Sequence, residues 1–237
     1  MTDEREIPSG LASAVTIAML TWKRLSRGKA LWVGAIIASV PVLFASAMRT
    51  TGTGGAPADL MVFEVLMLAV LPAMFVSSSI GEEIEERTTV YLWSRPVPRW
   101  AVLAGKLGAL VPVVLGLGLG SWVAALFLGP KLAPTVEALI AIAAGGTAIC
   151  LVAAGIATLV PKHGMPLTIS YMLFFDLPVG LMPVSLSELS ITHQIRVISG
   201  IGLETHQVHS MTGVLPLAIL SALWLSVALL RIRKLEA

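Results

Sequence analysis

The chain has 237 residues, of which 56% are hydrophobic and only 13% are charged, and its mean hydropathy is +0.88. A soluble domain of ordinary composition carries about 25% charged residues, so this chain has too few of them to cover a water-facing surface. The composition therefore excludes an independent soluble enzyme and predicts a protein embedded in a membrane.

Residues 1–29 are predicted to form a cytoplasmic tail followed by an amphipathic elbow helix. Apolar residues recur there at helical spacing, at Leu11, Val15, Ala18, Trp22 and Leu25. The basic residues Lys23, Arg24 and Arg27 occupy other faces of the same helix. This pattern is typical of a helix that lies in the membrane interface. The alternative is a slightly long first span with a basic flank.

Residues 30–237 are predicted to form one membrane domain of six transmembrane helices. A bilayer core of roughly 30 Å needs about 20 apolar residues per helical span. Six stretches meet this requirement, at Ala30–Met48, Leu60–Ile80, Leu107–Gly129, Ala138–Val160, Gly164–Leu186 and Thr212–Leu230. They are continuously apolar rather than alternating, which excludes a membrane β-barrel. The predicted fold is all-α.

The distribution of basic residues predicts the orientation of these spans. With both termini in the cytoplasm, only Arg49, Lys131 and Arg196 of the 16 lysines and arginines fall on the outer side. Cytoplasmic loops carry such an excess of positive charge. We therefore expect a multi-pass protein of the bacterial inner membrane with both termini in the cytoplasm.

The loop between the second and third spans, residues 81–101, differs from the others. Residues 81–100 hold four glutamates, three arginines and two prolines, around the apolar run Val90-Tyr91-Leu92-Trp93. The predicted orientation of the spans explains the arginines of this loop, but it does not explain an exposed Tyr-Leu-Trp run. Such an apolar knob between charged flanks is suited to a groove on a partner protein.

This loop resembles the cytoplasmic coupling segment of type-2 ABC exporter permeases. The matching residues are Glu82, Glu83, Glu86, Arg87, Thr88, Leu92, Ser94, Arg95, Pro96, Arg99, Gly105 and Lys106. The amphipathic elbow helix, the six spans, the cytoplasmic termini and a semi-polar external segment before the last span also agree with that family. The chain is compact for the family and has no fused ATPase and no large external domain.

The resemblance implies the membrane permease subunit of an ATP-driven exporter. A separate ABC ATPase subunit would bind ATP and Mg²⁺, so we expect no cofactor, metal or catalytic residue in this chain. A second permease copy, in a homodimer or as a paired permease, is also implied. The residues expected to couple to the ATPase are Glu82, Glu83, Glu86, Arg87, Thr88, Val90, Tyr91, Leu92, Trp93, Arg95 and Arg99.

Other functions fit less well. The run from Glu82 to Arg87 matches the E-E-x-x-x-R motif of CAAX-type membrane proteases. Those enzymes also need histidines within later spans, whereas all four histidines here lie in predicted loops. A non-transporting membrane scaffold is the second alternative. The chain has no phosphate-binding P-loop motif, so we do not expect it to bind nucleotide through one. Its basic residues flank spans, where orientation explains them, so we expect no nucleic-acid partner.

Two acidic residues lie within predicted spans, Asp176 in the fifth and Glu64 in the second. A carboxylate at that depth costs about 2.5–3.5 kcal/mol on insertion scales, so it should face protein or water. Each could line the translocation path or have a structural role, and for Glu64 the structural role is favoured. The external segment 187–211 is expected to form two short re-entrant helices, with Gly200 and Gly202 between them.

Overall fold

The structure is a computed structural model, and it describes residues 9–51, 57–85, 98–129, 135–183, 185–201 and 211–234. Every regular element in these ranges is a helix, so the all-α prediction is confirmed. Six helical segments are long and apolar enough to cross a membrane, and each overlaps one predicted span. They are Ala30–Thr51, Pro57–Glu82, Arg99–Leu128, Val136–Leu159, Pro161–Leu181 and Val214–Ile232.

The individual helices run in the following order. The first half contains α1 (Gly10–Arg27), α2 (Ala30–Thr51), α3 (Pro57–Pro72), the π-helical turn η1 (Ala73–Ser77), α4 (Ser78–Glu85) and α6 (Arg99–Leu128). The second half contains α7 (Val136–Leu159), η2 (Pro161–His163), α8 (Gly164–Tyr171), the π-helical turn η3 (Met172–Asp176), α9 (Leu177–Leu181), η4 (Ser185–Leu189), α10 (Ile191–Ser199), η5 (Met211–Gly213) and α11 (Val214–Lys234).

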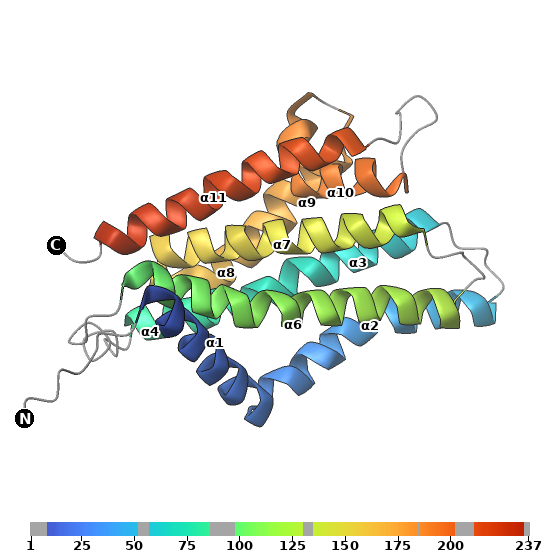
Figure 1. Cartoon of the computed structure of the whole chain (residues 1–237). Helices are drawn as coiled ribbons and strands as arrows, with labels where there is room; N and C mark the ends of the chain where they lie inside the picture. The colour runs from blue at the N-terminus through green and yellow to red at the C-terminus, as the bar shows by residue number, and fades with distance from the viewer. Residues whose placement is uncertain are drawn as a thin grey trace, which may run out of the picture.

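The bundle is built around α7, which packs against α6, α8, α10 and α11 (Figure 1). Two thirds of the α7 span is buried, but only 28% of the α2 span and 11% of the α11 span. Small residues of α7 allow this packing, since a Cβ atom at Gly145 would lie 2.3 Å from the side chain of Ile195 on α10. Close approach over small residues is how helices associate in membranes. The outer faces of α2 and α11 are left for lipid or another chain.

Helix α1 is present as predicted and crosses the start of α6 (Figure 1). Ser9 caps its N-terminus by accepting a hydrogen bond from the Ala12 N–H at 3.3 Å. The side of α1 that packs on the bundle carries the small residues Ser13 and Ala14. Leu11 and Trp22, from the predicted apolar face, are exposed. Contact of these exposed side chains with lipid remains our prediction.

Two spans contain a π-helical turn, and each turn places a polar residue inside the bundle. Ser77 at the end of η1 donates to the carbonyl of Ala153 at 3.0 Å and lies 2.8 Å from the Thr168 hydroxyl. Asp176 ends η3, which lies next to Pro178. A proline ring clashes with the carbonyl four residues earlier, and a local π turn relieves such a clash. Turns of this kind are frequent at functional sites.

The segment predicted to be external is helical where the structure describes it, and its helix α10 is largely buried. Helix α10 ends at Gly200, whose φ of 67° is the left-handed conformation that glycine adopts without strain. Ile191, Ile195 and Ile198 of this helix are fully buried against the bundle. The second helix of the predicted pair falls largely in residues 202–210, outside the described part. Re-entry of the segment into the membrane therefore stays a prediction.

Candidate functional site

The ends of the predicted coupling loop lie in one region of the bundle. We call this region the coupling junction; it comprises α1, α4, η2, the first two turns of α6 and the last turn of α11. All of these elements gather at the same end of the molecule (Figure 1). Most predicted coupling residues fall outside the described residues, namely Glu86, Arg87, Thr88, Val90, Tyr91, Leu92, Trp93 and Arg95. Of the others, the structure describes the side chains of Glu82 and Arg99 and the backbone of Glu83.

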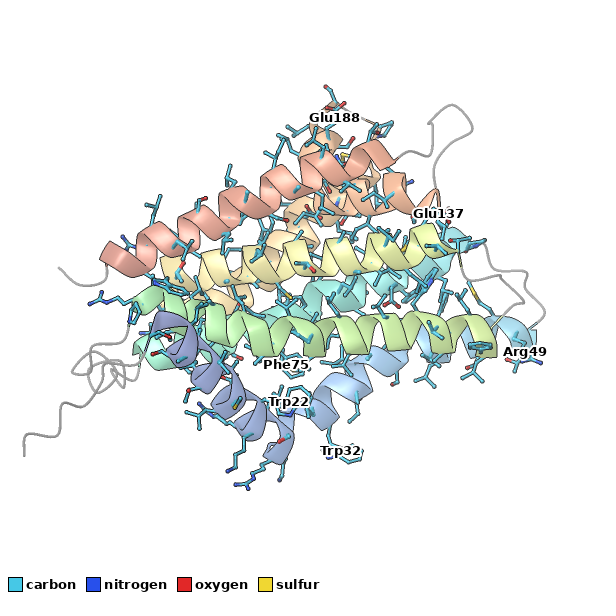
Figure 2. All side chains as sticks on the ribbon, in the orientation of Figure 1. Trp22, Trp32, Arg49, Phe75, Glu137 and Glu188 are labelled. Atoms are coloured by element: carbon cyan, nitrogen blue, oxygen red, sulfur yellow. The ribbon has the colours of Figure 1, made fainter. Side chains whose placement is uncertain are left out.

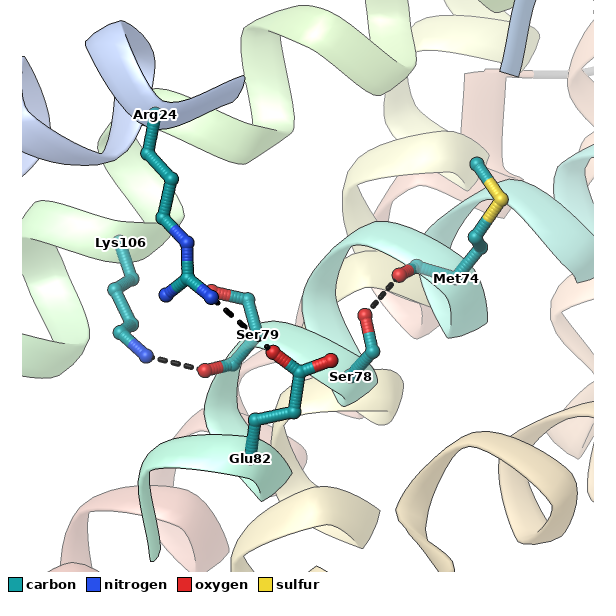
Figure 3. A network of polar contacts seen from close by, with 6 residues as sticks. All are labelled: Arg24, Met74, Ser78, Ser79, Glu82 and Lys106. Carbon is teal, nitrogen blue, oxygen red and sulfur yellow. Dashed lines mark hydrogen bonds and ion pairs between the residues drawn. The ribbon is translucent and has the colours of Figure 1, made fainter. Parts of the chain in front are cut away.

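Glu82 connects α4 to the elbow helix. Its carboxylate lies 3.6 Å from the guanidinium of Arg24 on α1, and the two side chains are 55% and 76% exposed (Figure 3). An ion pair this exposed contributes at most about 1 kcal/mol of stability. Its effect is therefore on orientation, since it sets α1 against the end of the second span.

Lys106 holds the third span to the second. Its side chain is only 3% exposed, and its ammonium donates a hydrogen bond to the backbone carbonyl of Ser79 in α4 (Figure 3). A buried ammonium is costly unless its protons are used in hydrogen bonds. The contact thus fixes the start of α6 to α4, one turn before the coupling loop leaves the bundle.

Gly105 seats α1 directly on α6. A Cβ atom at this position would lie 2.5 Å from the Ala14 carbonyl oxygen and 2.9 Å from the Ile17 Cβ. A similar approach occurs at Gly81, where a Cβ would lie 2.7 Å from the Pro161 carbonyl oxygen. The adjacent residues Gly105 and Lys106 therefore join three elements, with α1 on one side and α4 on the other.

Substitution Gly105→Val should separate α1 from α6 and destabilise the protein by about 1–3 kcal/mol, as overpacking does in other tightly packed sites. The matched control is Gly108→Val, one turn further along α6, where an added Cβ meets nothing within 4 Å. Thermal unfolding of both purified variants in the same detergent measures the difference. Equal melting temperatures would mean that α1 is not seated through Gly105.

Arg99 extends the junction to the last span. Its Nη1 atom donates to the carbonyl oxygen of Ile232 near the end of α11, at 3.4 Å. The two ends of the coupling loop are thus linked to α1, to η2 and to α11. A displacement of the loop would act on the second, third, fifth and sixth spans and on the elbow helix together.

Asp176 lies at a second polar site, near the other end of the fifth span, and is fully buried. One carboxylate oxygen accepts the Ile191 N–H at 2.8 Å. The other accepts the Thr192 N–H at 2.9 Å and the Thr192 hydroxyl at 2.7 Å. These donors form the N-terminus of α10, where a negative charge is favoured. The contacts give the structural alternative a physical basis, and a role in translocation stays a prediction.

Glu64 lies on α3, and its fully buried side chain faces α6. The Ser121 hydroxyl donates to its Oε2 atom at 3.3 Å. Within the described part of the chain, Glu64 Oε1 and Trp122 Nε1 have no hydrogen-bond partner. The carboxyl group therefore faces protein rather than lipid, as expected for an acid at this depth.

Glu82 and Arg99 were predicted coupling residues, and the structure shows their contacts, whereas Arg24, Gly105 and Lys106 were not among the predicted coupling residues. The pair Gly105-Lys106 at the start of the third span belongs to the family pattern, but the pattern does not give the physical reason for these two residues. Arg24 was placed on the elbow helix only as an interfacial cation. Its pairing with Glu82, 58 residues later, has no signal in a single sequence.

The chain matches a known protein family. A family model described as "ABC-2 family transporter protein" matches residues 20–181, more than half of the chain. The matched region begins within α1 and ends with α9, so it contains Arg24, Glu82, Lys106 and Asp176. No curated protein matches the chain.

Proposed function

Because the chain belongs to the ABC-2 family of transporter proteins, we propose that it is the permease subunit of an ATP-driven exporter coupled to a separate ATPase subunit. The family consists of membrane-spanning permease components of ABC transporters, which usually work with an ATPase subunit, and the six apolar helices make this chain a multi-pass membrane protein. ATP coupling, export and the identity of the partner are the proposed part. The family match favours a transporter over the protease and scaffold alternatives.

The coupling junction is the observation that carries this proposal. A permease without its own ATPase must receive force through a short element whose ends are firmly attached to the spans. Here the loop leaves α4 beside the Lys106–Ser79 contact and re-enters at Arg99, which binds the end of α11. ATP-driven closure of two ATPase subunits would pull on Thr88–Trp93 and move the spans between inward- and outward-facing arrangements.

A second permease copy is part of the proposal. The outer face of α2 carries large exposed side chains, including Trp32, Ile36 and Leu43, which are 64–76% exposed. Phe174 in the fifth span and Leu215 on α11 are exposed as well. Lipid and a partner permease can both cover such faces, so they leave room for a homodimer or a paired permease.

Purification from its own host membranes tests the proposal directly. The tagged chain should carry a stoichiometric ATP-hydrolysing subunit, and the pair should hydrolyse ATP in nanodiscs, whereas the chain alone should not. A preparation that retains no ATPase under mild detergent, and shows no ATP-dependent transport in vesicles, would contradict the coupling function.

Reporter fusions should confirm the predicted orientation in the inner membrane. Fusions at Gly54, Lys131 and Ser190 should be external, and fusions after Thr88, Lys162 and Ala237 should be cytoplasmic. The cation-rich end of the bundle supports this arrangement, and Arg49 and Glu137 lie at the opposite end (Figure 2). The predicted orientation follows from the positive-inside rule, by which cytoplasmic loops carry an excess of Lys and Arg. An external C-terminus would contradict the six-span orientation.

A further inference from the structure

An open groove of about 280 Å³ lies in the angle between α1 and α2. Figure 1 shows the two helices diverging from their connection near Gly28, and Figure 2 shows the Phe75 ring within the angle they enclose. The inner wall is formed by the apolar residues Met74, Phe75 and Leu110, and Ser78 and Ser79 lie beside them. The rim is polar and includes Arg24 and Lys29. The groove thus has one charged edge and one apolar wall.

Two cations, Arg24 and Lys29, and one carboxylate line the groove. No acidic residue occurs between Gly10 and Arg49, whereas Lys23, Arg24, Arg27 and Lys29 follow one another closely there. The acidic residue that lines the groove, Glu82, lies 3.6 Å from Arg24 and is 55% exposed. The C-terminus of α1 and the N-terminus of α2 both adjoin the groove, and their partial charges are opposite, so its positive charge comes from the two cationic side chains.

We propose that this groove binds an anionic phospholipid. Its phosphate would lie between Arg24 and Lys29, and an acyl chain would lie along Met74, Phe75 and Leu110. Both parts of the ligand follow from the lining. The cations would bind the phosphate, and the apolar residues would contact an acyl chain, which a small hydrophilic anion lacks. Basic pockets beside spans on the cation-rich side bind anionic headgroups in other membrane proteins.

The site has a direct connection to the coupling junction. Arg24 contacts both the groove and Glu82, so a bound phosphate competes with Glu82 for the same guanidinium. Lipid binding would therefore change the restraint between α1 and α4. The inference requires only that the chain spans a membrane, and it is independent of the proposed export function.

Titration of the delipidated full-length protein with phosphatidylglycerol, followed by native mass spectrometry, tests the site. Each cation near an anionic surface changes affinity by about fivefold, so Arg24→Gln/Lys29→Gln should weaken binding by about thirtyfold. The matched control Lys23→Gln/Arg27→Gln removes the same charge from α1 at exposed positions that do not line the groove, and it should bind almost like the wild type. Glu82→Gln should bind more tightly, because it frees Arg24.

Several results would overturn the proposal. Equal losses in both double variants would indicate general charge attraction, and equal binding of phosphatidylcholine would remove the requirement for an anionic lipid. Competition by inorganic phosphate at the affinity of the lipid would indicate a free-anion site instead. If the Arg24/Lys29 variant does not fold, Ala30→Trp fills the groove, and Ala35→Trp places the same ring on an exposed position of α2 outside it. Binding unchanged by Ala30→Trp would also overturn the site.

Discussion

Substitution Asp176→Ala should destabilise the protein by about 3 kcal/mol or more, without preventing membrane insertion. Three buried donors, the N–H groups of Ile191 and Thr192 and the Thr192 hydroxyl, lose their acceptor in this variant. Each buried donor left without a partner costs about 1–3 kcal/mol. The loss should be local, so hydrogen exchange at the start of α10 should accelerate more than exchange in α7.

Two further variants separate the structural role of Asp176 from a role in translocation. Asp176→Asn keeps one carbonyl acceptor and should recover part of the stability, whereas Asp59→Ala removes an exposed carboxylate and should change it by less than about 1 kcal/mol. Thermal unfolding and transport are measured on the same preparations. If Asp176→Ala is as stable as the wild type but defective in transport, the carboxylate belongs to the translocation path.

The number and approximate positions of the spans follow from the sequence because the membrane leaves few alternatives. In lipid every backbone polar group must be satisfied internally, so a continuously apolar stretch of sufficient length becomes a helix. The six predicted stretches and the six observed spans agree for this reason. Local departures were not predictable, since the π turns at Ala73–Ser77 and Met172–Asp176 depend on how each helix packs against its neighbours.

The partners of the buried polar residues could not be predicted either. The sequence indicates that Asp176 needs a partner in the membrane, but two of its three partners are the backbone N–H groups of Ile191 and Thr192, which almost any residue type would supply. For α1, the helical spacing of the apolar residues predicted the helix correctly, but it did not predict which side of the helix contacts the bundle. Ser13 and Ala14 form that side because small residues let α1 approach α6 at Gly105.

Truncation of the apolar knob, Leu92→Ala/Trp93→Ala, should release the ATPase subunit. Both side chains lie in the predicted coupling loop, and in the proposed complex they would be interface anchors buried in a groove of the ATPase. Loss of such an anchor typically costs 2 kcal/mol or more, so the pair should cost about 4 kcal/mol. That corresponds to a roughly thousandfold loss of affinity. Arg95→Glu should act in the same direction through misplaced charge.

The control for this experiment lies on the elbow helix. Leu20→Ala/Trp22→Ala removes the same two side-chain types from exposed positions of α1, and it should leave ATPase binding intact. Neither double variant alters a span, so expression and insertion should equal those of the wild type. Co-purification of the ATPase subunit in detergent and ATP hydrolysis in nanodiscs are the measurements.

Retention of the partner with coupled hydrolysis would exclude the coupling role. An intact complex with uncoupled hydrolysis would keep the role but place the binding energy on the charged flanks. The contacts of Glu82 and Arg99 would then connect those flanks to the spans.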